Sequence, residues 1–513
     1  MGTRDNVCDL FFSCAERSPG KAAIIDRDGS AETFGKLAED VKATAAYFHS
    51  KGIRKGDRVL VFVPIGIPLY RTVLALFHMG AVAVFLDEWV SRERLEVCCR
   101  IAKCKAFIAP FRLRALAFFI GELRKIPVWL GTRYTPATSA DPQALTHSSD
   151  TALITFTTGS TGIPKAADRT HGFLAAQFGA LVDKIRPETT DVDMPVLPIV
   201  LLLNLGTGVT SVIADFNSRK PETIDTEKIW MQIISSNVNR FVASPFVVEQ
   251  MAASGFNRKT RVRFFTGGAP VFPFQAERMK KGLPGSSVEI VYGSTEAEPI
   301  STISAEELIS EKNKSEKGLC VGKPYHGTTV RILPVTEKIR SFRTEEELDS
   351  ASLPTGKPGE IVVSGKHVLR HYIDNPEAEK QNKIFIGENV WHRTGDSGFL
   401  DENGNLFLCG RCSSLITDEH GETLAPFLWE GWFLTLPGVS MGTIAQHDGK
   451  IIAVIECAPE KENEVEKLIL GKYPFSSVVF LPRLPRDPRH FSKIDYGKLK
   501  EILPKKQAGR QNP

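Results

Sequence analysis

Long apolar runs and an excess of one charge are both missing from this sequence. The most apolar stretch, AFIAPFRLRALAFFIGELRK from Ala106, is interrupted by Pro110, Arg112 and Arg114, so it is too broken to cross a bilayer. We expect a buried strand and a buried helix there, with contact with a membrane surface as the alternative. The net charge of +4 is too small to indicate a nucleic-acid binder.

A secretory signal and a metal-binding set of cysteines are also missing. The N-terminal residues contain neither a long apolar run nor a small-residue cleavage site. Nine cysteines in a chain of 513 residues without such a signal predict reduced thiols and a cytoplasmic protein. Cys409 and Cys412 form a CxxC, but no second pair lies at metal-ligand spacing, so two ordinary thiols are favoured over a zinc site.

Two histidines four residues apart, His367 and His371, are the other candidate metal ligands. Asp374-Asn375-Pro376 follows them, and this sequence is typical of a turn. We therefore expect both histidines to be exposed and not to bind a metal.

The common nucleotide and nucleophile motifs are absent as well, but one segment has the composition of a phosphate loop. From Thr155 it reads TFTTGSTGIPKAADRTHG. A Walker loop needs Gly-Lys-Ser/Thr opening a helix, and a nucleophile elbow needs glycine two residues before its serine, where Thr158 stands. Glycines bring N–H groups close to an anion, hydroxyls add donors, and lysine adds positive charge. The segment predicts a triphosphate-binding loop of Thr157, Thr158, Gly159, Ser160, Thr161, Gly162 and Lys165.

Helix-period and strand-like segments alternate through the first half of the chain. Helices are predicted at 39–50, 71–79 and 229–237, and strands at 58–63, 81–86, 240–243 and 261–266. This alternation favours an α/β fold of layered helices and largely parallel sheets.

The pattern changes in the second half. Short alternating strands at 329–333, 359–363 and 398–408, the last a hairpin with Asn403-Gly404 at its tip, predict a small β-barrel-like part. From residue 410 the sequence indicates a small α+β unit. We predict a large N-terminal domain, residues 1–409, hinged to a small mobile domain, residues 410–513, with the active site between them.

Further short segments follow the phosphate loop. They are TGGAP from Thr266, YGSTE from Tyr292, HRTGDSG from His392, GRCSS from Gly410 and LPRDPRHFSKIDYGKL from Leu484. Any one of them alone reads equally well as a surface turn. Together, in this order, they resemble the motifs of the adenylate-forming superfamily of acyl-CoA synthetases, luciferases and nonribosomal-peptide adenylation domains. The resemblance spans nearly the whole chain and implies an AMP-forming enzyme that activates a carboxylate with ATP.

The resemblance also implies roles for individual residues. The expected adenine-binding turn is Gly267, Gly268, Ala269 and Pro270, and the next nucleotide-binding group is Tyr292, Gly293 and Ser294, with Tyr292 stacked on adenine. Asp396 would hold the ribose and Arg411 the ribose and phosphate. The expected catalytic residues are Thr295 at the α-phosphate, Glu296 as the Mg²⁺ ligand, and Lys493 beside the charge that develops on the α-phosphate.

Departures from ordinary acyl-CoA synthetases point to one branch of the superfamily. Ser413 and Ser414 follow Arg411, Thr417 stands where a lysine is usual, and the closing loop reads PRDPRHFSKI. Together with AEPISTISAEEL after Glu296, they resemble the β-lactone synthetases of bacterial long-chain olefin biosynthesis. The resemblance implies a 2-alkyl-3-hydroxy fatty acid whose own hydroxyl displaces AMP from the adenylate. Intramolecular attack benefits from high effective molarity and needs no CoA.

Two alternative functions stay open. A fatty acyl-CoA or acyl-carrier-protein ligase would form a thioester from the same adenylate. A nucleotide-binding relative with a dead site would bind ATP without releasing pyrophosphate, but the retained Lys165, Glu296, Asp396, Arg411 and Lys493 argue against it.

Three details of the second step and its setting are also open. His490 is a candidate base for the hydroxyl, although capping the loop or binding a phosphate is the favoured role. The apolar run PIVLLLNLGTG from Pro198 would line an alkyl tunnel or, more commonly, begin a buried helix. The expected partners are a fatty acid and ATP, a thiolase or hydrolase of the same pathway, and a membrane surface.

Overall fold

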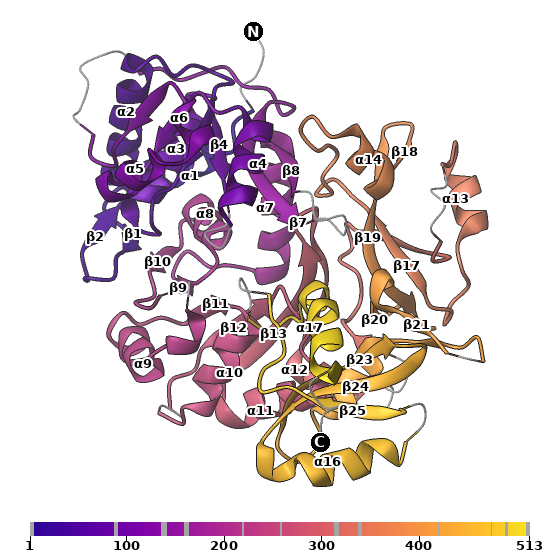
Figure 1. Ribbon diagram of the computed structural model, residues 1–513. Coiled ribbons are helices and arrows are strands. Elements are labelled where there is room, and N and C mark those ends of the chain that lie inside the picture. The colour runs from indigo at the N-terminus through magenta and orange to yellow at the C-terminus, as the bar shows by residue number, and fades with distance from the viewer. Residues whose placement is uncertain are drawn as a thin grey trace.

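In the residues that it describes, the computed structural model contains three large sheets, a three-stranded C-terminal sheet and a two-stranded sheet (Figure 1). It describes residues 5–86, 91–134, 141–158, 164–217, 220–256, 259–311, 318–336, 341–418, 420–472, 475–487 and 491–508. Helices lie on and between the sheets of the N-terminal part, and the C-terminal strands and helices form a separate smaller body at the lower right of Figure 1.

One mainly parallel sheet has eight strands. Their order is β14 (Ala297–Ser304), β13 (Ser287–Ser294), β12 (Arg263–Gly267), β11 (Arg240–Ala243), β9 (Val192–Pro195), β10 (Thr210–Val212), β1 (Ala22–Ile25) and β2 (Ala31–Thr33). The strands from β13 to β1 pair in parallel, while β14 and β2 are antiparallel edges. Because parallel strands end at the same edge of a sheet, residues after β9, β11, β12 and β13 converge.

A second mainly parallel sheet has six strands. Their order is β6 (Val128–Leu130), β5 (Ala106–Ile108), β3 (Arg58–Val61), β4 (Val82–Phe85), β7 (Thr151–Thr158) and β8 (Pro164–Thr170). Only β8 runs antiparallel, paired with β7. The prediction of α/β layers with largely parallel sheets is therefore confirmed.

Helices cover these sheets and fill the space between them. They are α1 (Asp9–Arg17), α2 (Phe34–Ser50), α3 (Ile67–His78), α4 (Arg92–Ala102), α5 (Phe111–Ala117), α6 (Gly121–Arg124), α7 (His171–Ile185), α8 (Pro198–Thr207), α9 (Thr226–Ser235), α10 (Pro245–Ala253), α11 (Pro273–Gly282) and α12 (Ala305–Ser310). In Figure 1, α7 and α8 lie between the two sheets. Helix α7 follows β8 directly, and Thr170, the last residue of β8, caps it: Thr170 Oγ1 accepts a hydrogen bond from Phe173 N at 3.1 Å.

The third sheet is antiparallel and corresponds to the part predicted as β-barrel-like. Its strands run in the order β15 (Leu319–Cys320), β20 (Leu406–Arg411), β19 (Asn389–Leu400), β17 (Gly359–Ser364) and β16 (Thr329–Leu333), with β18 (Lys383–Ile386) also paired with β19. Helices α13 (Glu345–Ala351) and α14 (Pro376–Asn382) lie beside it. The predicted hairpin is confirmed as β19 and β20, joined by a turn in which Gly404 has φ of 77°.

The smaller C-terminal body has an α+β fold, as predicted. Its sheet has the order β23 (Val439–His447), β24 (Lys450–Cys457) and β25 (Ser477–Phe480). The other elements are β21 (Ile416–Thr417), β22 (Thr423–Leu424), α15 (Pro426–Phe433), α16 (Glu462–Leu470) and α17 (Tyr496–Ala508). This body has its own hydrophobic cores, one of them centred on Phe433 and Ile455.

Two expectations about individual residues are wrong. His367 is 2% exposed, because its Nε2 lies 3.0 Å from both Thr328 Oγ1 and the carbonyl of Pro299. The segment from Ala106 does begin with the buried strand β5, but α5 is not buried: Phe111 is 76% exposed, and Phe119 just beyond the helix is also 76% exposed. One side of α5 therefore faces solvent.

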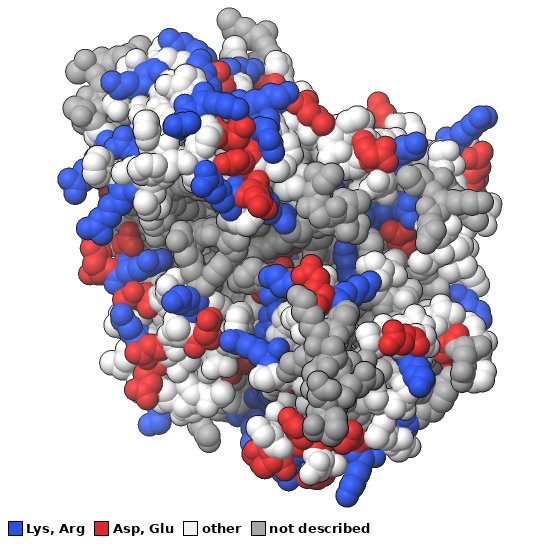
Figure 2. Space-filling model, viewed as in Figure 1, with Lys and Arg blue, Asp and Glu red and all other residues white. Residues whose placement is uncertain are grey.

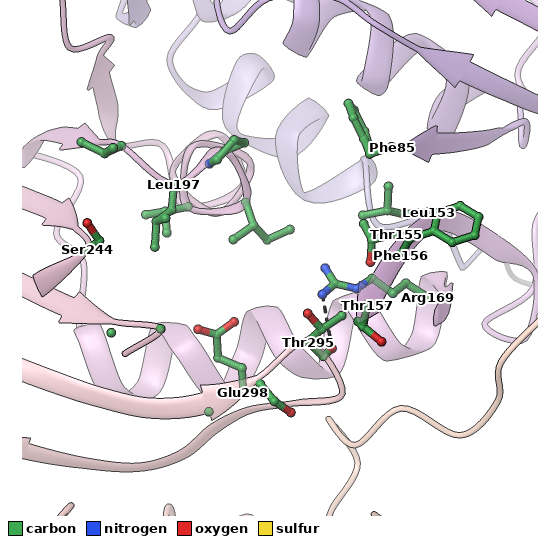
Figure 3. A pocket seen from close by; sticks show the side chains of 18 of the residues that line it. Phe85, Leu153, Thr155, Phe156, Thr157, Arg169, Leu197, Ser244, Thr295 and Glu298 are labelled. Carbon is green, nitrogen blue, oxygen red and sulfur yellow. Dashed lines mark hydrogen bonds between the residues drawn. The ribbon is translucent and has the colours of Figure 1, made fainter. Parts of the chain in front are cut away.

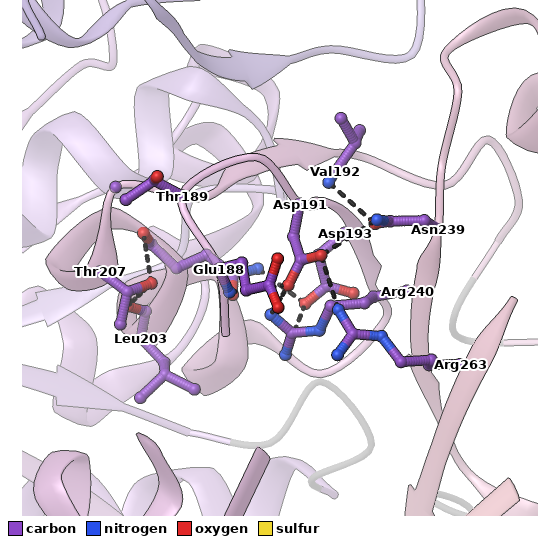
Figure 4. Close-up of polar contacts among 12 residues, drawn as sticks. Glu188, Thr189, Asp191, Val192, Asp193, Leu203, Thr207, Asn239, Arg240 and Arg263 are labelled. Atoms are coloured by element: carbon purple, nitrogen blue, oxygen red, sulfur yellow. Dashed lines mark hydrogen bonds and ion pairs between the residues drawn. The ribbon is translucent and has the colours of Figure 1, made fainter. Parts of the chain in front are cut away.

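A buried cluster of charge lies where β9, β11 and β12 begin (Figure 4). Arg240 is fully buried, with Nη1 at 3.5 Å from Asp191 Oδ2 and Nη2 at 3.8 Å from Asp193 Oδ2. Arg263 Nη2 lies 2.6 Å from Asp191 Oδ1, and Asn204 donates to Asp193 at 2.8 Å. The cluster ties three strands together at the edge of the sheet opposite their carboxyl ends.

The described surface carries both signs of charge, and the described helices are too short or too polar to span a membrane. In Figure 2, Lys and Arg side chains are interspersed with Asp and Glu over the described part of the visible face. No helix in the described ranges is long and apolar enough to cross a membrane.

Candidate active site

One pocket lies where the carboxyl ends of the parallel strands meet the β7–β8 hairpin. Its volume is about 950 Å³, which is in the range of small-molecule sites. Residues that follow β9, β11, β12 and β13 line it: Val196, Ser244, Gly268 and Thr295. Lys493 and Asp487 of the C-terminal body line it as well, so the two bodies share this pocket.

The predicted phosphate loop falls at the tip of the β7–β8 hairpin. Thr157 pairs with Lys165, and both line the pocket. Gly159, Ser160, Thr161 and Gly162 lie outside the described residues, as does the side chain of Thr158. Lys165 Nζ donates to Asn382 Oδ1 at 3.1 Å. The described ends of the loop thus bring a hydroxyl and an ammonium group to the same wall of the pocket.

Glu296, the predicted Mg²⁺ ligand, is buried beside Thr157. Thr157 Oγ1 donates to Glu296 Oε1 at 3.2 Å, and Tyr372 OH donates to the same oxygen at 3.0 Å. Burial would raise the pKa of Glu296, but the basic side chains around it (His392, Lys383 and Lys165), with the hydrogen bond from Tyr372, lower it to about 2. The side chain is therefore an ionised carboxylate with hard oxygens, which suits Mg²⁺.

Two buried basic side chains that sequence reasoning did not single out surround this carboxylate. Lys383 and His392 face each other across the β18–β19 pair. Burial lowers the pKa of Lys383 to about 7 and that of His392 to about 3. His392 Nδ1 donates to the carbonyl of Asn382 at 3.1 Å. His392 opens the HRTGDSG segment and could have been found there, whereas nothing in the sequence around Lys383 signals its burial.

The two predicted ribose-binding residues meet where Arg411, the last residue of β20, pairs with Asp396 within β19. Asp396 and Arg411 are cross-strand partners, and Arg411 Nη1 donates to Asp396 Oδ1 at 2.8 Å. Tyr292 OH donates to the other oxygen, Oδ2, at 2.8 Å. The carboxylate is thus held between a phenol and a guanidinium, and the predicted adenine-stacking residue lies beside it.

The predicted adenine-binding turn follows β12. Gly267 and Gly268 line the pocket, whereas Ala269 and Pro270, the next two residues, do not. A Cβ on Gly267 would lie 2.6 Å from the carbonyl oxygen of Val291, and Gly268 has φ of 85°. Both positions therefore require glycine, the first for close packing and the second for its backbone conformation. Gly293, Ser294 and Thr295 also line the pocket.

The closing loop docks on the N-terminal part near Lys493. Ser492 Oγ accepts a hydrogen bond from Phe246 N at 2.9 Å, and the ring of Phe491 lies 5.0 Å from that of Phe246. These contacts hold the segment that carries Lys493 at the pocket wall. The candidate base His490 lies outside the described residues.

The other end of the pocket is largely apolar. It is lined by Phe62, Val63, Leu69, Tyr70, Val73, Phe85, Leu95, Leu113, Leu181, Ile185, Leu197 and Phe265. Helix α8 confirms that the run from Pro198 begins a buried helix, since Leu201 and Leu205 are fully buried in the core. Ile199 and Leu202 of the same helix line the pocket. Sequence reasoning missed two charged side chains that line the pocket, Arg169 and Glu298 (Figure 3).

Cys409 and Cys412, the CxxC of the sequence, are both shielded from solvent, and burial raises the pKa of each thiol to about 12. Within the described ranges, no three His, Cys, Asp or Glu side chains are placed to hold a metal ion together.

Comparison with known proteins gives consistent matches. The model of the AMP-binding enzyme family matches residues 11–373. The olefin beta-lactone synthetase of Stenotrophomonas maltophilia (strain K279a) is 29% identical over 420 residues, 78% of this chain and 75% of its own length. The 2-succinylbenzoate--CoA ligase of Geobacillus sp. (strain WCH70) is 26% identical over 510 residues, 96% of each chain.

A solved structure has the same fold. The crystal structure of ATP-bound MatB from Rhodopseudomonas palustris superposes with a TM-score of 0.82 at 21% identity, covering 98% of this chain and 99% of that one. The predicted architecture of a large domain with a small C-terminal domain is confirmed by this likeness.

Proposed function

Because the chain belongs to the AMP-binding enzyme family, we propose that it activates a long-chain 3-hydroxy fatty acid with ATP and closes the adenylate to a β-lactone. The chain is an AMP-forming ligase by its family and relatives. The observation that carries the finer proposal is the pocket itself. The pocket is lined by the charged side chains of Lys165, Glu296, Arg411 and Lys493, and also by many aliphatic and aromatic side chains.

The first step makes the acyl-adenylate and pyrophosphate from the acid and ATP. In this proposal Lys165 and Lys493 offset charge on the phosphates, and Asp396 with Arg411 holds the ribose. Glu296 would hold Mg²⁺, which neutralises the phosphate oxygens as pyrophosphate leaves. The ionised, hydrogen-bonded carboxylate of Glu296 fits that role.

The second step forms the ring. The 3-hydroxyl oxygen bonds to the acyl carbon, the bond from that carbon to the AMP oxygen breaks, and AMP leaves while the hydroxyl loses its proton. The nucleophile is held in the same molecule as the acyl carbon, so the step gains from proximity. The name of the Stenotrophomonas relative supports this product.

A thioester-forming acyl ligase is the second candidate. It is favoured by the 96% coverage of both chains in the match to a CoA ligase. The chemistry of the first step is identical, so only the second product distinguishes the two.

The deciding experiment is mass spectrometry of products formed from ATP, Mg²⁺ and a long-chain 2-alkyl-3-hydroxy acid, with and without CoA. A β-lactone and AMP formed without CoA would support the proposal. A thioester formed only with CoA would replace it with the ligase.

The proposal includes a membrane surface as the source of substrate. Phe111, Phe118 and Phe119 are 76%, 61% and 76% exposed, and arginine side chains lie over two of these rings: Arg114 over Phe111 and Arg124 over Phe118, each at 6.0 Å. Aromatic and basic side chains together suit anionic lipid headgroups. Leu113 on the same helix lines the pocket.

Sedimentation with vesicles tests this contact. Binding to phosphatidylglycerol-containing vesicles should exceed binding to phosphatidylcholine vesicles and fall in Phe118→Ser/Phe119→Ser. The control Phe256→Ser removes an exposed phenylalanine elsewhere (41% exposed) and should leave binding unchanged. A thiolase or a hydrolase of the same pathway completes the set of proposed partners.

A further inference from the structure

Two charged side chains other than the predicted site residues also face the pocket. Arg169 projects from β8 and is 7% exposed, and Glu298 projects from β14. Both line the pocket, and Figure 3 shows the guanidinium and the carboxylate pointing into it. The adenylation chemistry proposed above uses neither of them, and a plain alkyl chain offers neither of them a hydrogen bond.

Their contacts leave part of their hydrogen-bonding capacity unused. Arg169 Nη2 donates to the carbonyl oxygen of Thr295 at 3.2 Å, while its buried Nε has no hydrogen-bond partner. Glu298 Oε2 accepts a long hydrogen bond, 3.4 Å, from Gln177 Nε2. Among the described residues no direct ion pair joins Arg169 to Glu298, in contrast to the 2.5 Å contact of Arg393 Nη2 with Glu360 Oε2.

Buried charges that lack a direct partner are costly, and they persist where a ligand or a function compensates them. Here an N–H donor and a carboxylate acceptor face the same cavity. A substituent that is both a donor and an acceptor would satisfy both. A second carboxylate on the substrate would be repelled by Glu298, and an ammonium group by Arg169. A neutral hydroxyl meets neither repulsion.

The pair also lies at the right place along the pocket. Arg169 donates a hydrogen bond to the carbonyl oxygen of Thr295, the residue expected at the α-phosphate. Glu298 follows three residues later on the same hairpin, because β13 turns back into β14 with Ser294 opposite Ala297. A hydroxyl bound here would therefore be close to the acyl carbon rather than far along the alkyl chain.

We propose that Arg169 and Glu298 form a subsite for the 3-hydroxyl group of the acid, with Glu298 accepting its hydrogen bond and Arg169 donating to its oxygen. This inference rests on the proposed function and names the two residues that recognise the 3-hydroxyl of its substrate. Such binding would also hold the hydroxyl in a fixed place relative to the adenylate.

The test compares two acids in the first half-reaction. Pyrophosphate release is measured with 3-hydroxyhexadecanoic acid and with hexadecanoic acid, which lacks only the hydroxyl. The wild-type protein should show kcat/KM at least about 10-fold higher for the hydroxy acid, since a hydrogen bond to a charged group is strong. Pyrophosphate is released in the first step, so this measurement does not depend on lactone formation in the second step.

Three variants locate the effect. Glu298→Leu should lose the preference while retaining activity with hexadecanoic acid, because only the acceptor is removed. Glu298→Gln should keep most of the preference, because its amide oxygen still accepts. Leu202→Ala is the matched control: Leu202 also lines the pocket but is apolar, so both acids should be affected alike.

The outcomes separate this inference from the proposed function. A wild-type protein without preference for the hydroxy acid, or an undiminished preference in Glu298→Leu, overturns the subsite. A preserved preference with a CoA thioester as final product supports the subsite and refutes lactone formation. If Glu298→Leu fails to fold, the wild-type protein is tested instead with 3-methoxyhexadecanoic acid, which cannot donate a hydrogen bond from this position. If kcat/KM for the methoxy acid equals that for hexadecanoic acid, the subsite is supported. If it equals that for the hydroxy acid, the subsite is overturned.

Discussion

Two groups of buried charge lie at opposite ends of the same parallel strands. At the N-terminal edge of the eight-stranded sheet, Arg240 and Arg263 form ion pairs with Asp191 and Asp193. We call this cluster closed, because its charges pair with each other and not with a ligand. At the carboxyl edge, Glu296 faces a cavity together with several cations. Closed pairs serve the fold, whereas charges directed into a cavity are available to a ligand.

The buried carboxylate of Glu430 sharpens this contrast. Glu430 in the C-terminal body is 6% exposed and accepts hydrogen bonds from the hydroxyls of Thr443 and Tyr496. Burial raises its pKa to about 7, whereas the cations around Glu296 lower the pKa of that carboxyl to about 2. Both groups are buried, so the charge of the neighbours decides the direction of the shift.

The largest expected effect follows from opening the closed cluster. Arg240→Met keeps the volume but leaves Asp191 and Asp193 short of a cation. Removing one member of a buried pair costs about 3–5 kcal/mol, so the free energy of unfolding should fall by that amount. Urea unfolding can be followed by the fluorescence of Trp230, which is buried in α9. Unchanged kcat of the folded protein would confirm a purely structural role, and an unchanged unfolding midpoint would contradict it.

The next largest effect is expected for a charged residue that lines the pocket. Lys493→Ala should lower the rate of adenylate formation by about 100- to 1,000-fold, because one donor to developing charge is lost. The unfolding free energy should stay the same. Pyrophosphate release measures the rate, and Lys498→Ala, where the side chain is 60% exposed and pairs with Asp495, is the control. Full activity of Lys493→Ala would refute the proposed role.

Glu430 yields a pH-dependent prediction. Its folded pKa of about 7 exceeds the value of about 4.3 in an unfolded chain. The folded state therefore keeps a proton that the unfolded state loses, and stability falls as pH rises between these values. Glu430→Gln should match the wild type near pH 4 and be more stable at pH 8 by up to about 4 kcal/mol. The fluorescence of Trp429 and Trp432 in α15 reports this unfolding. Parallel stability curves for the two proteins would contradict the prediction.

The smallest effect tests how far exposure weakens a pair within the closed cluster. Arg263 contacts Asp191 at 2.6 Å, but its side chain is 38% exposed. Water therefore screens the interaction, and Arg263→Met should cost about 1 kcal/mol. The same urea unfolding measures it beside Arg240→Met. Equal losses in the two variants would show that burial does not set the strength of these pairs.

The sequence predicted much of the architecture, because the alternation of elements is local. Strands and helices follow from the period of apolar residues, and both parallel sheets were expected. The errors come from tertiary packing. His367 is buried because the carbonyl of Pro299 and Thr328 surround it, and α5 exposes phenylalanines although its sequence is apolar.

For the site residues, the sequence predicted which residues matter but not how they contact one another. Asp396 and Arg411 were both chosen from the sequence, yet their cross-strand contact appears only in the structure. Lys383 carries no motif, and its altered pKa arises from burial beside Glu296 and Lys165. Identity of a residue is readable in a sequence, but its electrostatic environment comes from distant segments.

The sequence by itself determined the class of chemistry, because glycines, hydroxyls and charged residues that bind phosphates act over a few neighbouring positions. Only the tertiary structure decided what the pocket recognises beyond the nucleotide. Arg169 and Thr295 are 126 positions apart in the chain and hydrogen-bonded in the fold. The physical reason is that burial removes water, so a side chain's partners and charge depend on which strands the fold brings together.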